Sequence, residues 1–138
     1  VHGRYRAIDY SAVSVEKARK VNDGAIAEGR CNVQQASVAE LPFEAEQFDV
    51  VTAFETVILA GLAQNFREVY QVLKPAERFF ICNEANGETA KDDKWTQIIN
   101  GMTIYTDADL KVYLEQAGFC KIQSHKNKKG WLCVTAQK

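Results

Sequence analysis

The chain has 138 residues, of which 46% are hydrophobic and 25% charged, and its formal net charge is -1. These values are ordinary for a globular protein, and we expect one domain over residues 1–138. A nearly neutral chain gives no support to nucleic-acid binding, which usually needs a basic face or stripe. We interpret the basic segment 126–130 (KNKKG) as a solvated hairpin turn rather than a binding patch.

The four cysteines show no metal-binding spacing. Cys31, Cys82, Cys120 and Cys133 form no CxxC pair, so we expect no metal site. Three of them lie in apolar runs, as reduced thiols do, which favours a cytoplasmic location. We find no signal peptide. The most apolar segment contains Glu55 and is too short to cross a bilayer, so we expect no membrane partner.

The first third of the chain predicts a strand, a helix and a second strand. Residues 5–8 (YRAI) read as a strand, and Ser11 and Ser14 offer N-caps to the segment that follows. Apolar residues at helical spacing predict a single helix over 14–29, which Gly29 ends. Residues 31–37 (CNVQQAS) predict a short polar strand near the edge of a sheet.

The middle of the chain repeats this order with more apolar strands. Residues 48–54 (FDVVTAF) form a continuous apolar run, which predicts a strand buried on both faces. A helix follows, stopped by Lys74-Pro75, and residues 78–83 (RFFICN) predict another strand. The helix is indicated by the spacing of Leu62, Phe66, Val69, Tyr70 and Leu73.

The last third predicts one helix and an antiparallel hairpin. Thr106 and Asp109 resemble a capping box at the start of a helix that Gly118 closes. The segments CKIQSHK and GWLCVTAQ then flank a Gly-containing turn, as in a hairpin. Residues 85–103 predict no clear element. Within them Trp95, Ile98, Ile99 and Met102 suggest a short helix that either caps a substrate pocket or packs in the core.

The order of these elements predicts the fold class. Strands that alternate with helices are typical of an α/β protein with a mostly parallel sheet and helices on both faces. The closing hairpin adds one antiparallel strand to that sheet.

Five segments of the chain, in order, resemble class I S-adenosylmethionine-dependent methyltransferases. They are IDYS, QASVAELPFEAEQFDVVTAFET, FREVYQVLKPAERFFICNE, YTDADLKVYLEQAGF and GWLCVTAQK. The chain looks most like the small-molecule branch that includes the ubiquinone/menaquinone-type enzymes. The resemblance implies a Rossmann-like sheet, S-adenosylmethionine as cofactor and methyl transfer to a small-molecule acceptor. A nicotinamide-dependent oxidoreductase shares the strand-end acid, but the series LPF, FDVV and LKP disfavours it.

The resemblance implies a cofactor site at two strand ends. Asp9 matches the acid whose carboxylate accepts both ribose hydroxyls of the cofactor, and Tyr10 matches a residue that flanks the adenine. Ser37 and Val38 match the adenine-contacting turn, although the family commonly has an Asp where Ser37 stands. Taken alone, Asp9 is more typical of a helix N-cap than of a ribose ligand, and Ser37 is more typical of a turn residue than of a cofactor contact.

The resemblance places Phe54, Glu55 and Thr56 at the carboxyl edge of the sheet, lining the methionine part of the cofactor and the substrate. Glu55 either faces the substrate or lies at a solvent-exposed strand end. Catalytic residues are unknown, because the sequence contains no nucleophilic triad or paired carboxylates. That absence suits methyl transfer, in which the enzyme mainly aligns the two reactants and excludes water.

The chain departs from the family at its amino-terminal end. The family's first strand and its GxGxG-type loop are absent, so we expect an amino-terminally incomplete domain. That strand lies between the strands that carry Asp9 and residues 50–54, and its loss would leave backbone groups unpaired. The chain must then close the gap, borrow a strand in a homodimer, or pair with a missing piece. The alternative function is therefore a non-catalytic fragment or assembly module that completes its sheet through dimerisation.

Overall fold

The computed structural model describes residues 3–57, 60–84 and 102–138. These residues form two compact units, Val1–Pro42 (unit 1) and Phe43–Lys138 (unit 2), each of which is described by itself. The helix suggested by Trp95, Ile98 and Ile99 lies outside the described residues.

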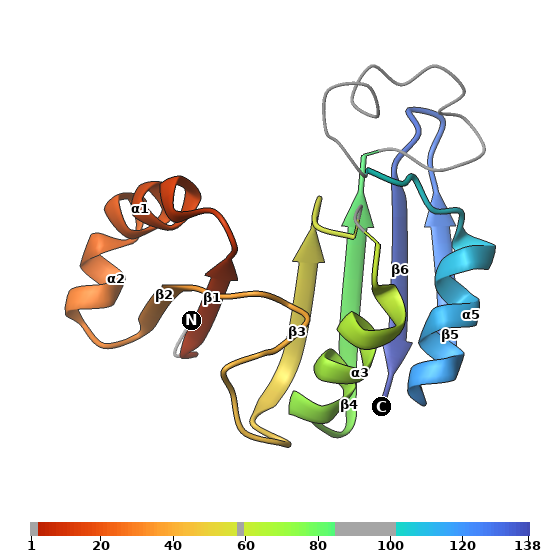
Figure 1. Ribbon diagram of the computed structural model, residues 1–138, viewed down its shortest axis with the longest axis horizontal. Coiled ribbons are helices and arrows are strands. Elements are labelled where there is room, and N and C mark those ends of the chain that lie inside the picture. Colours follow the sequence, from red (N-terminus) through yellow and green to blue (C-terminus); the bar gives the residue numbers. More distant parts are fainter. Residues whose placement is uncertain (1–2, 58–59, 85–101) are drawn as a thin grey trace. The chain divides into compact units, whose positions relative to one another are not determined.

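Unit 1 is a strand–helix–helix–strand unit (Figure 1). The two strands pair in parallel, with a register that runs from Tyr5 opposite Cys31 to Asp9 opposite Gln35. Parallel pairing puts the carboxyl ends of both strands at the same edge. The elements are β1 Tyr5–Asp9, α1 Ala12–Val21, α2 Asp23–Ala27 and β2 Cys31–Gln35.

The single helix predicted over residues 14–29 is wrong, because the helix breaks at Asn22. Ser11 is the N-cap of α1, and its hydroxyl oxygen accepts from the backbone N–H of Ser14 at 3.3 Å. At the break, the Asn22 side chain donates to the Ala18 carbonyl at 2.8 Å. Asn side chains compete with the helical backbone in this way. The two helices still bury one small apolar core, made of Val15, Cys31 and Val33 with Ala18, Ala25 and Ile26.

Unit 2 contains a four-stranded sheet of strand order β3-β4-β6-β5. The strands β3 and β4 are parallel, whereas β6 is antiparallel to both β4 and β5, so the predicted closing hairpin is confirmed. The elements are β3 Phe48–Phe54, α3 Leu62–Val72, β4 Leu73–Asn83, α5 Asp107–Ala117, β5 Cys120–Lys126 and β6 Leu132–Gln137.

The core of unit 2 lies between one face of this sheet and the helices α3 and α5 (Figure 1). Phe79 on β4 lies at the centre of this core. The centroid of its ring is 5.7 Å from the ring centroid of Phe66 on α3 and 5.8 Å from that of Phe119. Eight side chains of this core are almost completely buried: Phe66, Leu73, Phe79, Ile81, Leu110, Leu114, Leu132 and Val134. Each large side chain buried in this way stabilises the fold by about 1.5–3 kcal/mol relative to exposure.

The expectation that residues 48–54 are buried on both faces is wrong. Val50 is 51% exposed and Phe54 is 64% exposed. Both lie on the sheet face that also carries Phe80 of β4, which is 36% exposed. The described helices of unit 2 cover only the opposite face, and an apolar run in the sequence does not reveal which faces are covered.

The strand β4 begins earlier than predicted, directly after α3, and it includes Lys74 and Pro75. Ala76 then adopts a left-handed backbone conformation, φ 66°, which residues other than glycine rarely adopt. The carboxyl-terminal residues hold this turn in place. The Ala76 N–H donates to the Lys138 carbonyl at 3.1 Å, and the Gln137 side chain donates to the Ala76 carbonyl at 2.6 Å.

The predicted capping box of α5 is confirmed. The Thr106 hydroxyl oxygen accepts from the Asp109 N–H at 3.1 Å, and the Asp109 carboxylate accepts from the Thr106 N–H at 3.0 Å. At the other end, Gly118 has φ 107°, and an added Cβ would lie 3.0 Å from the Tyr70 ring. Both ends of the helix are therefore fixed by local chemistry as well as by packing.

We expect Thr106→Ala to lower the free energy of unfolding by about 1 kcal/mol, because it leaves the Asp109 N–H without its side-chain acceptor. Urea unfolding followed by circular dichroism measures this change. Thr106→Ser is the matched control, since it keeps the hydroxyl oxygen and should retain most of the stability. Equal losses in both variants would show that the hydroxyl does not cap the helix.

Candidate functional site

The carboxyl end of β1 presents the Asp9 carboxylate. One of its oxygens, Oδ1, accepts from the Ser11 N–H at 2.7 Å, and Asp9 itself is half-buried. The N-cap of α1 is Ser11, so the interpretation of Asp9 as the helix cap is wrong. A carboxylate offers about four lone-pair positions, and the contact with Ser11 uses one of them. The remaining positions can accept further hydrogen bonds from a ligand.

The residues after β1 are held against the end of β2. The Gln35 side chain donates to the Tyr10 carbonyl at 2.9 Å, and the Ala36 N–H donates to the Asp9 carbonyl at 3.1 Å. The Tyr10 side chain is 71% exposed, so its ring is available for stacking. Sequence reasoning missed Gln35. The feature of the sequence that could have indicated Gln35 is its position as the last residue of a polar strand.

The turn after β2 places Ser37 and Val38 at the same edge as Asp9 and Tyr10. The Ser37 hydroxyl oxygen accepts from the Ala39 N–H at 3.2 Å, and Ser37 bridges to Glu40. Ser37 therefore acts as a turn residue, while its hydroxyl hydrogen remains to be donated. Val38 is 38% exposed. The structure thus brings together four of the predicted site residues, all in unit 1.

The other predicted site residues lie at the carboxyl end of β3 in unit 2. Glu55 has φ 54°, its N–H donates to the Cys82 carbonyl at 3.0 Å, and its carboxylate accepts from the Glu84 N–H. Partial desolvation raises the pKa of Glu55, the Glu84 N–H opposes that rise, and the charge of Glu84 adds to it. Phe54 and Thr56 flank Glu55 and are exposed.

Asn83, the last residue of β4, is a site residue that sequence reasoning missed. It is 4% exposed, and its side-chain nitrogen donates to the Val57 carbonyl at 3.1 Å. Its Oδ1 atom is buried and accepts no hydrogen bond from any described residue. A buried acceptor without a partner costs about 1–3 kcal/mol, so this atom carries an energetic cost in the described part of the fold. The signal in the sequence is a polar residue that directly follows the apolar run FFIC.

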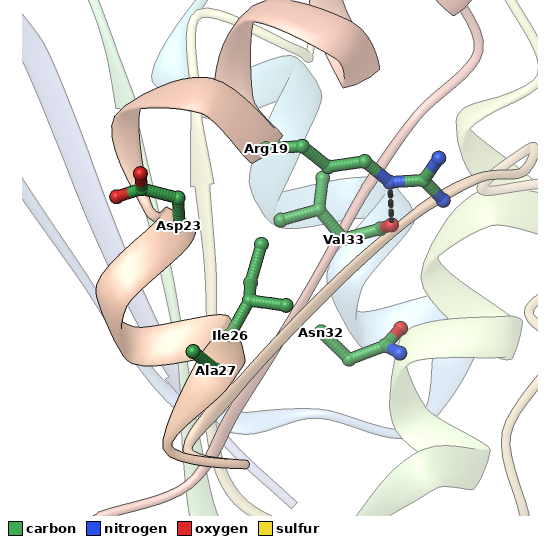
Figure 2. A pocket seen from close by; sticks show the side chains of 6 residues that line it. All are labelled: Arg19, Asp23, Ile26, Ala27, Asn32 and Val33. Carbon is green, nitrogen blue, oxygen red and sulfur yellow. Dashed lines mark hydrogen bonds between the residues drawn. The ribbon is translucent and has the colours of Figure 1, made fainter.

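A shallow hollow lies beside β2 in unit 1, away from the strand ends (Figure 2). None of the predicted site residues line it. The Arg19 side chain crosses it and donates to the Val33 carbonyl at 2.8 Å, as the dashed line in Figure 2 shows. Its lining residues are Arg19, Asp23, Ile26, Ala27, Asn32 and Val33.

Two further searches cover only the described residues. Among them, no three or more His, Cys, Asp or Glu side chains are grouped so that they could hold a metal ion. In the same ranges, no helix has both the length and the apolar character that crossing a membrane requires.

A family model described as "Methyltransferase domain" matches residues 1–81, which is more than half of the chain. The chain belongs to this family. A curated relative, the ubiquinone/menaquinone biosynthesis C-methyltransferase UbiE of Geotalea daltonii, is 35% identical over 75 residues. That match covers 54% of this chain and 32% of the relative, so the matched part spans about a third of the relative's length.

Solved structures of methyltransferases share the fold. A chain in the complex between the Haloferax volcanii Trm112 methyltransferase activator and a methyltransferase aligns with a TM-score of 0.84 and 19% identity, covering 98% of this chain and 72% of its own. Geranyl diphosphate methyltransferase in complex with SAM aligns with a TM-score of 0.77 and 11% identity. The alignment covers 98% of this chain and 68% of the methyltransferase chain. The fold is not restricted to methyltransferases in these alignments, since the [4+2]-cyclase SpnF aligns with a TM-score of 0.78 and 16% identity. That alignment covers 99% of this chain and 66% of the cyclase chain. Because identities are this low, the likeness shows the fold alone.

The family assignment confirms the resemblance to class I S-adenosylmethionine-dependent methyltransferases, and S-adenosylmethionine is the cofactor of that family. The residues at the ends of β1 and β2 suit it chemically. Asp9 has acceptor positions left for two ribose hydroxyls, and Tyr10 offers an exposed ring beside them. The α/β fold with a closing antiparallel hairpin also agrees with the prediction.

We expect Glu55→Gln to stabilise unit 2 progressively as the pH rises. A folded-state pKa above the ordinary value means that folding favours the protonated acid, so ionisation of Glu55 weakens folding. The stability difference between variant and wild type should be small near about pH 3.5 and should grow towards pH 7. Urea unfolding at several pH values measures it.

Glu40→Gln is the control for removal of an exposed surface charge. A Glu55→Gln effect that stays constant with pH, or that falls as the pH rises, would contradict the raised pKa of Glu55.

Proposed function

We propose that this chain binds S-adenosylmethionine and takes part in methyl transfer to a small-molecule acceptor. The observation that carries the proposal is the Asp9 carboxylate at the carboxyl end of β1, grouped with Tyr10, Ser37 and Val38 at one edge. Ligands bind at this edge in open α/β sheets. The family assignment supports the same cofactor.

Each residue of the unit 1 group has a separate role in this proposal. Asp9 accepts hydrogen bonds from both ribose hydroxyls of the cofactor while its Oδ1 also holds the Ser11 N–H. The Tyr10 ring flanks the adenine face. Ser37 accepts from the adenine amino group through the lone pair that Ala39 does not use, and the Val38 backbone N–H donates to a ring nitrogen.

The residues at the end of β3 orient the reactants. S-adenosylmethionine supplies a methyl group that its sulfonium already makes electrophilic. For unit 2 by itself, we propose that Phe54 contacts the methionine part of the cofactor and that Thr56 faces the acceptor. Glu55 accepts hydrogen bonds from hydroxyl or amino groups of the acceptor. Fixing the acceptor in line with the methyl group is the main task left to the protein.

Charge and similarity support a small organic acceptor. The net charge of -1 offers no attraction to nucleic acid, and the matched relative is named for ubiquinone/menaquinone biosynthesis. We also propose that the protein acts in the cytoplasm, because all four cysteines are free thiols.

A second candidate function is an assembly module that forms a homodimer. One observation favours it: Val50, Phe54 and Phe80 expose apolar surface on the same face of the unit 2 sheet. A second copy could cover that face. Size-exclusion chromatography with light scattering separates the two candidates. A dimer that binds no cofactor supports the assembly role, and a monomer that binds cofactor contradicts it.

We expect Asp9→Asn to weaken binding of S-adenosylhomocysteine by about 10- to 150-fold, measured by isothermal titration calorimetry. The substitution removes the charge that strengthens hydrogen bonds from the ribose hydroxyls, about 1.5–3 kcal/mol. Asp23→Asn is the matched control, because the Asp23 carboxylate also accepts from a neighbouring backbone N–H, that of Gly24 at 2.7 Å.

The control variant should bind as the wild type does. Absence of measurable heat with millimolar S-adenosylhomocysteine and the wild-type chain would overturn the proposed cofactor binding. Equal weakening by both substitutions would remove the specific role of Asp9.

A further inference from the structure

Two cysteines lie directly opposite each other on neighbouring strands of unit 2. Cys82 of β4 is the register partner of Cys133 of the antiparallel strand β6. Both are free thiols and both are half-buried, whereas Cys31 is buried and Cys120 exposed. Side chains of directly opposed residues point to the same face of a sheet, so the two thiols share one face.

The backbone hydrogen bonds show which type of pair this is. The Cys82 carbonyl accepts from the Glu55 N–H at 3.0 Å, on the side of β3. The N–H and C=O of one strand residue point the same way, so those of Cys82 point away from β6. Cys82 and Cys133 therefore form a non-hydrogen-bonded pair, in which the Cα atoms are typically about 4.5 Å apart. That separation lies within the range of disulfide-linked residues.

The two thiols already interact. Burial raises the pKa of the Cys82 thiol to about 11, with smaller contributions from its hydrogen bond with Cys133 and from the charges of Cys133 and Glu55. Cys82 therefore stays protonated at neutral pH and is a poor nucleophile by itself. In a thiol–disulfide exchange we therefore assign the second step to Cys82.

A metal site does not explain this pair. His125 of β5 is the register partner of Cys133, which places a third possible metal ligand in the same row. Yet no group of three or more His, Cys, Asp or Glu residues in the described ranges can hold a metal ion. Two sulfur atoms remain, and their shared chemistry is two-electron oxidation.

We propose that Cys82 and Cys133 form a reversible disulfide by exchange with a low-molecular-weight disulfide such as glutathione disulfide. The Cys133 thiolate attacks one sulfur of glutathione disulfide, and one glutathione thiolate leaves. Cys82 then gives its proton to solvent and displaces the second glutathione from Cys133. Two protein thiols are oxidised, and one glutathione disulfide is reduced to two glutathione molecules.

The proposal is independent of methyl transfer, because it rests on strand register and on the state of the two thiols. The bond would join β4 to β6 one residue before Asn83, at the strand end that also holds Glu55. Cross-strand bonds in non-hydrogen-bonded pairs need the two Cβ atoms to approach more closely than unlinked pairs do. Strained disulfides of that kind are the readily reduced ones.

The test uses Cys120→Ser as the parent, so that the exposed thiol does not react. After incubation with glutathione disulfide, peptide mapping by mass spectrometry should find Cys82 linked to Cys133 within one chain, with no glutathione retained on either. Dithiothreitol should restore both thiols. Cys82→Ser in the same parent should instead retain one glutathione on Cys133, because the second step is blocked.

Stable glutathione on Cys133 in the parent, or both thiols left unreacted, would overturn the proposal. A Cys82–Cys133 bond between two chains, seen as a dimer on a non-reducing gel, would overturn it as well. The parent alone decides the question if Cys82→Ser does not fold.

Discussion

The alternation of side chains along β4 is the constraint on which unit 2 depends. Phe79, Ile81 and Asn83 point to the helix-covered face, whereas Phe80 and Cys82 point to the other. Because side chains alternate with a period of two, a slip of one residue would exchange these two sets. The same register therefore fixes the aromatic core, buries Asn83 at the strand end and places Cys82 opposite Cys133.

Patterns that act locally could be read from the sequence, and patterns that depend on tertiary contacts could not. Ser11 as a cap, the Thr106–Asp109 capping box and the closing hairpin follow from neighbouring residues alone. The break at Asn22 depends on a competing side-chain hydrogen bond, and the exposure of Val50 depends on which sheet face is covered. Both features depend on tertiary structure, so the local sequence does not reveal them.

The candidate site shows the same division. The sequence indicated Asp9 and Glu55 because both follow predicted strands, and the structure puts both at strand ends. Their environments differ in a way that no pattern reveals. Asp9 keeps acceptor positions beside a fixed turn, whereas Glu55 is partly desolvated and its carboxylate accepts a hydrogen bond from the Glu84 N–H. Gln35 and Asn83 were not predicted because each side chain contacts a residue that is distant in the sequence and lies just after another strand.

The central claim is that the edge formed by the ends of β1 and β2 binds the cofactor. Backbone amide NMR shifts recorded during titration with S-adenosylhomocysteine test it most directly. We expect the largest shifts at Tyr10, Ser11 and Val38, with little change at Asp23 and Asn32, which line the hollow beside β2. Shifts centred on that hollow, or no shifts at the strand ends at saturating ligand, would contradict it.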